Sequence, residues 1–101
     1  MDFHRVASTS DLKPGEMMNA EVGGKEICVA KVGDKYYAIG NRCTHMSCLL
    51  SEGTLEGTNV TCACHNSVFD VQTGAVVRGP AKKPEPLYQV KVDGQEVLVG
   101  I

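Results

Sequence analysis

The sequence predicts an all-β protein, an antiparallel β-sandwich or barrel. Short runs of strand-forming residues alternate with glycine-containing turns along all 101 residues, and helical periodicity is hardly present. About eight strands at this spacing are typical of a sandwich or barrel. A chain of this length is expected to form one domain, residues 1–101, with one modest core.

Each expected strand is a short apolar run bounded by turn residues. In chain order the runs are 20–22, 26–32, 36–39, 59–62, 67–71, 74–77, 87–92 and 96–99. Tight turns join neighbouring runs at Gly23–Gly24, Gly33–Asp34 and Asp93–Gly94, and the last of these gives the strongest hairpin signal. Residues 79–86 hold three of the four prolines and are therefore expected to form a loop.

Composition excludes several classes of protein. The net charge of −2, without a long basic run, gives no electrostatic reason to expect nucleic acid or a membrane surface as a partner. No apolar stretch is long enough to span a bilayer, and the first residues lack the pattern of a signal peptide. The expected location is the cytoplasm, where a cysteine–histidine cluster is more often a metal site than a disulfide.

Two short segments, "CTHMSC" (43–48) and "CACHNS" (62–67), hold most of the metal-binding side chains. They contain four of the five cysteines and two of the three histidines. Each segment follows a predicted strand, so two loops on one β scaffold can bring these side chains together. This is the arrangement that a metal site requires.

The spacing of these residues resembles the motif of Rieske [2Fe–2S] proteins. Cys43-x-His45 is followed, after sixteen residues, by Cys62-x-x-His65. The resemblance extends to "DLKPGE", "KVGDKYYAIGNRCTH", "FDVQTG", "GPA" and the terminal hairpin, and so covers essentially the whole chain. It implies a Rieske-like antiparallel β-sandwich or barrel with a small cluster-binding subdomain, whose two loops are about 42–48 and 62–67.

By this resemblance, Cys43 and Cys62 bind one iron of a single [2Fe–2S] cluster, and His45 and His65 bind the other. An oxidised [2Fe–2S] core carries a charge of +2, so two thiolates bring the site to 0, whereas four would bring it to −2. An electron is added more easily to a neutral site. The exchange of two thiolates for imidazoles therefore raises the potential, to roughly −150 to +300 mV from about −400 mV.

The resemblance also assigns roles outside the four ligands. Cys48 and Cys64 occupy the positions at which respiratory Rieske proteins have a loop-joining disulfide, so we expect a Cys48–Cys64 bridge; the alternative is two reduced thiols. Ser67 matches a serine that donates a hydrogen bond to a bridging sulfide, which stabilises the reduced state. Met46 is placed to shield the cluster. Phe69 replaces a hydrogen-bonding tyrosine, so an intermediate-to-high potential is expected.

Two departures from the usual Rieske pattern lie in the second loop, where Ala63 and Asn66 stand at positions usually held by proline and glycine. Asn66 replaces a glycine and is expected to adopt a positive φ, which Asn tolerates better than most residues. Exposed ligand imidazoles imply that the midpoint potential falls at high pH. This is because oxidised iron lowers the pKa of the free imidazole N–H.

The resemblance implies a soluble one-electron carrier and not an enzyme. Its expected donor is a flavin-dependent NAD(P)H reductase, and its expected acceptor is an oxygenase or another redox protein that docks near His45 and His65. Alternatives are a fragment or relative of a respiratory Rieske subunit, or a redox sensor. A terminal oxygenase needs a second iron site, for which only His4 remains.

The remaining candidate residues also have simpler interpretations. The four ligands could also form a Cys₂His₂ zinc site. Such sites, however, usually pair cysteine with cysteine and histidine with histidine, whereas here each segment contains one ligand of each kind. Cys28 is expected to be a buried apolar residue. Lys82 and Lys83 are expected to be a solvated pair, with a docking role as the less favoured alternative.

Overall fold

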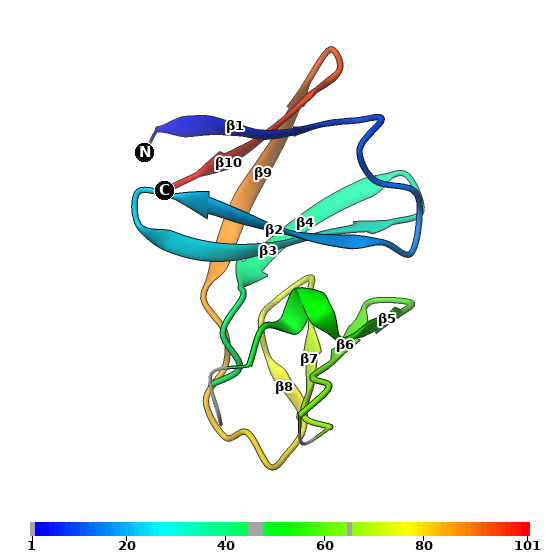
Figure 1. Cartoon of the computed structure of the whole chain (residues 1–101), viewed down its shortest axis with the longest axis vertical. Coiled ribbons are helices and arrows are strands. Elements are labelled where there is room, and N and C mark those ends of the chain that lie inside the picture. The colour runs from blue at the N-terminus through cyan, green and yellow to red at the C-terminus, as the bar shows by residue number, and fades with distance from the viewer. Residues whose placement is uncertain (1, 45–47, 65) are drawn as a thin grey trace.

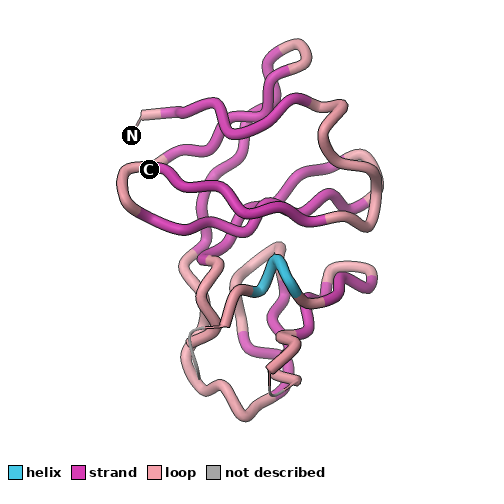
Figure 2. The backbone as a smooth tube through the Cα atoms, in the orientation of Figure 1, coloured by secondary structure: helices cyan, strands magenta, loops and turns pink. Residues whose placement is uncertain are grey.

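The computed structural model of the chain describes residues 2–44, 48–64 and 66–101. Over these residues it consists of two antiparallel sheets and one short 3₁₀ helix, η1 (Leu50–Glu52), as Figures 1 and 2 show. The predicted all-β fold is confirmed. No helix in the described part of the chain is long and apolar enough to cross a membrane.

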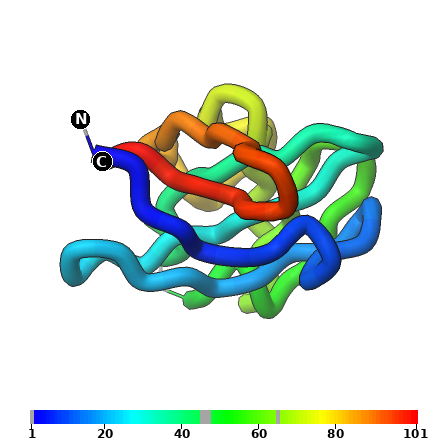
Figure 3. Tube along the Cα trace, turned by 90° about the horizontal axis from the view of Figure 1, so that it is seen from above, coloured from blue at the N-terminus to red at the C-terminus, as the bar shows by residue number. Residues whose placement is uncertain are grey.

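The larger sheet has six strands in the order β1-β10-β9-β4-β3-β2. Their bounds are β1 (Phe3–Ser8), β2 (Met17–Val22), β3 (Lys25–Val32), β4 (Lys35–Gly40), β9 (Leu87–Asp93) and β10 (Glu96–Gly100). The two outermost strands, β1 and β2, contact each other, so the sheet curls into a nearly closed barrel (Figure 3). This curling brings the two edge strands next to each other, which limits the exposed edge on which other chains can pair.

The smaller sheet has four strands in the order β5-β6-β7-β8, and it projects from one end of the barrel (Figure 1). The strands are β5 (Thr54–Glu56), β6 (Asn59–Thr61), β7 (Val68–Asp70) and β8 (Val76–Arg78). The molecule is accordingly elongated, with extents of 38 × 26 × 18 Å. Both cysteine-containing loops lie in this smaller part.

Strand β3 is shared between two apolar cores. Ile27 and Val29 belong to the core inside the barrel, whereas Cys28 and Ala30 belong to the core between the barrel and the smaller sheet. Successive side chains of a strand point to opposite faces, and here both faces are covered. This explains why the sequence "ICVA" is continuously apolar instead of alternating.

The second core reaches the cysteine loops directly. Cys43 and Cys62 are members of it, packed with large side chains from both sheets, such as Ile39 of β4 and Phe69 of β7. Two of the ten strands, β1 and β5, were not among the predicted runs. The other eight agree with the predicted runs to within a few residues at their ends.

Candidate metal centre

Cys43 and Cys62 each begin a loop that closes on itself. The Cys43 N–H donates to the Cys48 carbonyl over 2.7 Å, and the Cys62 N–H donates to the Ser67 carbonyl over 2.8 Å. Both cysteines are almost fully buried, with 2% and 1% of their surface exposed. Each thiol is therefore held at the base of a closed turn, away from bulk water.

The second loop needs an unusual backbone conformation to close. Asn66 has φ of 61°, and its N–H donates to the Cys62 carbonyl over 3.0 Å. This confirms the expected positive φ. His45, Met46 and His65 lie outside the described residues, so their roles as ligands and shield stay predictions.

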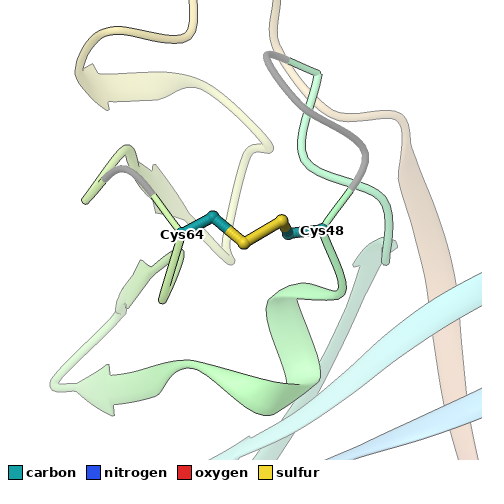
Figure 4. The surroundings of a disulfide bond; sticks show 2 residues. All are labelled: Cys48 and Cys64. Carbon is teal, nitrogen blue, oxygen red and sulfur yellow. A yellow bond between two sulfur atoms is a disulfide. The ribbon is translucent and has the colours of Figure 1, made fainter.

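A disulfide between Cys48 and Cys64 joins the two loops (Figure 4). Its two Cα atoms are 6.5 Å apart, across 16 positions of sequence. The sulfur of Cys62 lies within 4.8 Å of both disulfide sulfurs. Since a disulfide sulfur is not a thiolate, this group of three sulfurs offers a metal only one thiolate, that of Cys62. The free thiols are Cys28, Cys43 and Cys62.

Ser67, immediately before β7, is fully buried. Its Oγ accepts a hydrogen bond from the Ala81 N–H over 3.0 Å. A hydroxyl both accepts and donates, so this contact fixes the oxygen and leaves its proton available to an acceptor in the loop. The geometry is compatible with the donor role expected of Ser67.

The proline-containing segment 79–86 completes the loop end of the molecule. Besides the Ala81–Ser67 bond, the Thr44 hydroxyl donates to the Lys83 carbonyl over 2.7 Å. The segment is thus bonded to both cysteine loops, to the first through Thr44 and to the second through Ser67. The sequence predicts this segment as a loop but contains no sign of these attachments.

Glu85 is a buried carboxyl group that sequence analysis missed. Only 5% of the residue is exposed, and its Oε2 has no hydrogen-bond partner among the described residues. Burial raises the pKa of this carboxyl to about 7, although a hydrogen bond from the Thr44 backbone acts in the opposite direction. Gly40 makes room for it, because a Cβ there would lie 2.5 Å from Glu85 Oε1.

We expect the buried carboxyl group of Glu85 to make the folded protein less stable as the pH rises. Its folded-state pKa is above the ordinary value of 4.5. The stability linked to the neutral form is therefore complete below pH 4.5 and is lost as the pH rises through about 7. The free energy of unfolding should fall over this window by no more than about 3 kcal/mol.

The check is denaturant unfolding of wild type and Glu85→Gln between pH 5 and pH 8. The Gln variant should lose this part of the pH dependence, whereas Glu52→Gln, at an exposed position of η1, should retain it. Parallel pH profiles for wild type and Glu85→Gln would contradict the assignment.

The described donor groups fit the thiolate part of an iron–sulfur site. Two buried free thiols stand on two loops that a disulfide joins, and a buried hydroxyl lies beside them. The family model of the Rieske [2Fe-2S] domain matches residues 2–99. The chain belongs to the Rieske [2Fe–2S] family. Membership of the Rieske family implies one [2Fe–2S] cluster per chain.

Known Rieske relatives cover the chain from end to end. The ferredoxin component of biphenyl 2,3-dioxygenase from Rhodococcus jostii is 39% identical over 101 residues, which are 100% of this chain and 94% of the relative. The ferredoxin of carbazole 1,9a-dioxygenase from Nocardioides aromaticivorans superimposes with a TM-score of 0.94 at 39% identity, covering 98% of this chain and 97% of that chain.

A third comparison concerns a complex of two proteins. A ferredoxin solved in complex with the oxygenase of carbazole 1,9a-dioxygenase matches with a TM-score of 0.91 and 37% identity. The match covers 96% of this chain and all of that ferredoxin. The chain is therefore similar to a ferredoxin whose structure was determined in complex with an oxygenase.

Proposed function

We propose that this chain is a one-electron carrier of an oxygenase system. It binds the Rieske cluster through Cys43, His45, Cys62 and His65, and a bound [2Fe–2S] cluster supplies reversible one-electron chemistry. The observation that carries the proposal is the pair of buried free thiols on two disulfide-joined loops, in a chain similar throughout to dioxygenase ferredoxins. Residues 1–101 act as a single domain.

The chain's own groups have distinct tasks in this function. The thiolates of Cys43 and Cys62 bind iron, and the closed turns below them hold both sulfurs in place. The apolar core around Phe69 keeps water from this side of the site. Ser67 donates its hydroxyl proton to sulfur, which stabilises negative charge and so favours the reduced state. Met46 shields the cluster.

The proposed partners are a flavin-dependent NAD(P)H reductase as donor and an oxygenase as acceptor, docking near His45 and His65. The ferredoxin–oxygenase complex among the relatives supports the acceptor.

The chain itself does no bond-making chemistry, in keeping with the names of its relatives as ferredoxin components. We place it in the cytoplasm. The relatives favour this pathway over a respiratory one, although the disulfide is the feature that a respiratory subunit would share.

Replacement of Ser67 by alanine is expected to lower the midpoint potential. Loss of one hydrogen bond to sulfur removes about 1–2 kcal/mol of preference for the reduced state, which for one electron is about 40–90 mV. The measurement is a redox titration of the loaded protein. Ser51→Ala is a matched control, because Ser51 also accepts one hydrogen bond, from Asn41, but lies on η1. Equal potentials for wild type and Ser67→Ala would contradict the role.

The carrier function is tested by reconstitution. The reductase and oxygenase of a biphenyl 2,3-dioxygenase system are mixed without their own ferredoxin, and the cluster-loaded chain is added. We expect NADH-dependent turnover of biphenyl to return, and the chain without its cluster to be inactive. A loaded chain that is reduced chemically but restores no turnover would argue against the oxygenase pathway and favour a redox sensor.

The fall of the midpoint potential at high pH, expected from exposed ligand imidazoles, also stays a prediction.

A further inference from the structure

The loop end of the molecule is positively charged, although the chain as a whole is negative. Segments 42–49, 62–69 and 78–84 contain four basic residues and no acidic ones, whereas the rest of the chain contains six basic and twelve acidic residues. The four are Arg42, Arg78, Lys82 and Lys83. The described parts of the three segments belong to the smaller part of the molecule, below the barrel in Figure 1. These three segments therefore carry only positive charge, whereas the remainder of the chain is acidic on balance.

Two of the four cations are engaged within the chain. Arg42 forms an ion pair with Glu26 over 2.9 Å, and Arg78 donates to the Asn66 carbonyl over 3.4 Å. Lys82 and Lys83 are both exposed. Within the described ranges 2–44, 48–64 and 66–101, neither lysine has an ion-pair partner. Their charges are thus available to another molecule.

The backbone under the lysine pair is fixed at both ends. The preceding residue, Ala81, donates to Ser67 of the second loop, and the Lys83 carbonyl accepts from Thr44 of the first loop. Both lysines line an open hollow of about 500 Å³ together with Thr44 and Pro80. The pair therefore stands in a defined position beside the loop that holds Cys43, and is not carried on a loose tail.

We propose that Lys82 and Lys83 form an electrostatic docking surface for a carboxylate-bearing patch on a redox partner protein. This inference rests on the proposed carrier function and adds the chemistry of the partner's surface. When the two surfaces that meet in a small interface carry opposite charges, the proteins encounter each other faster and in the right orientation, without binding tightly. The remainder of the chain has an excess of acidic residues and repels an acidic partner, so the encounter is favoured when the loop end faces that partner. The preference weakens as salt screens the charges.

The test uses two electron acceptors of opposite charge, plastocyanin with an acidic surface and cytochrome c with a basic one. Stopped-flow oxidation of the reduced, cluster-loaded chain gives a rate constant for each. A substitution that changes the midpoint potential of the chain affects both rate constants in the same direction. The ratio of the two rate constants therefore reports mainly on docking. We compare Lys82→Glu/Lys83→Glu with Lys25→Glu/Lys35→Glu, which changes the net charge equally but at exposed positions at the turns of the barrel.

We expect the plastocyanin to cytochrome c ratio to fall at least about tenfold in the Lys82/Lys83 variant at low ionic strength, and to recover near 1 M salt. The barrel variant should change the ratio less than about threefold. Lys82→Gln/Lys83→Gln should give an intermediate fall and serves if the Glu variant folds poorly. Equal changes in the two Glu variants would overturn the docking surface alone. A wild-type chain that reduces neither acceptor would instead overturn the carrier function.

Discussion

Replacement of Cys62 by serine is expected to abolish cluster binding, whereas replacement of Cys28 by alanine should leave it intact. Both cysteines are buried and free. Cys28, however, lies inside β3, where desolvation and then the nearby Glu85 carboxylate raise the pKa of its thiol to about 12. It therefore remains a neutral thiol at physiological pH, while Cys62 stands at the base of a closed loop beside the disulfide.

The measurement for this pair of variants is iron and inorganic sulfide per chain, together with visible absorption. Wild type and Cys28→Ala should contain about two iron atoms each, as a [2Fe–2S] cluster requires. Cys62→Ser should contain almost none while keeping the circular dichroism of a β protein. Normal iron content in Cys62→Ser, or its loss in a folded Cys28→Ala, would show that the ligands are wrongly assigned.

The second large effect is expected from Cys48→Ser/Cys64→Ser. The bridge closes 15 residues, so its loss should lower the free energy of unfolding by about 3 kcal/mol in the chain-entropy model. The disulfide is the covalent link between the two loops, and its loss leaves weaker attachments, such as the segment bonded to Thr44 and Ser67. The double variant is preferred because a lone Cys64 thiol would lie within 4.8 Å of Cys62 and compete for iron.

Two measurements on the loaded protein test this prediction. Denaturant unfolding should show the loss of stability, and the cluster absorbance should decay faster in the double variant than in wild type. Wild type treated with a thiol reductant should approach the variant, since Cys64 is exposed. Unchanged unfolding and unchanged decay would mean that the bridge does not stabilise the loops.

The strands that sequence alone predicted are those with local signals. Gly24 and Gly94 have φ of 79° and 62° and stand in hairpin turns, a conformation that glycine adopts without strain. The missed strand β1 has three exposed residues at its start and pairs only with β10, at the other end of the chain. The missed β5 has three residues. The sequence of β1 contains no local sign of its distant partner, whereas β5 pairs with the neighbouring β6 across the turn at Gly57 and was missed because it is so short.

The candidate site divides in the same way. The spacing of Cys43, His45, Cys62 and His65 is a local pattern, so the amino-acid sequence alone reveals it. The Thr44–Lys83 bond joins residues 39 positions apart, and the Ser67–Ala81 bond spans 14. Glu85, in a segment with three prolines, carries no mark of burial in its sequence, because the core around it is assembled from distant strands. Such contacts follow from tertiary packing alone.

The most direct test of the central claim is pulsed EPR of the purified, reduced protein. Two thiolates on one iron and two imidazoles on the other predict an unpaired electron coupled to two histidine nitrogens, in a sample with about two iron atoms and two sulfides per chain. A spectrum without nitrogen coupling would indicate ligation by cysteine alone. A colourless, EPR-silent protein that contains zinc would contradict the account entirely.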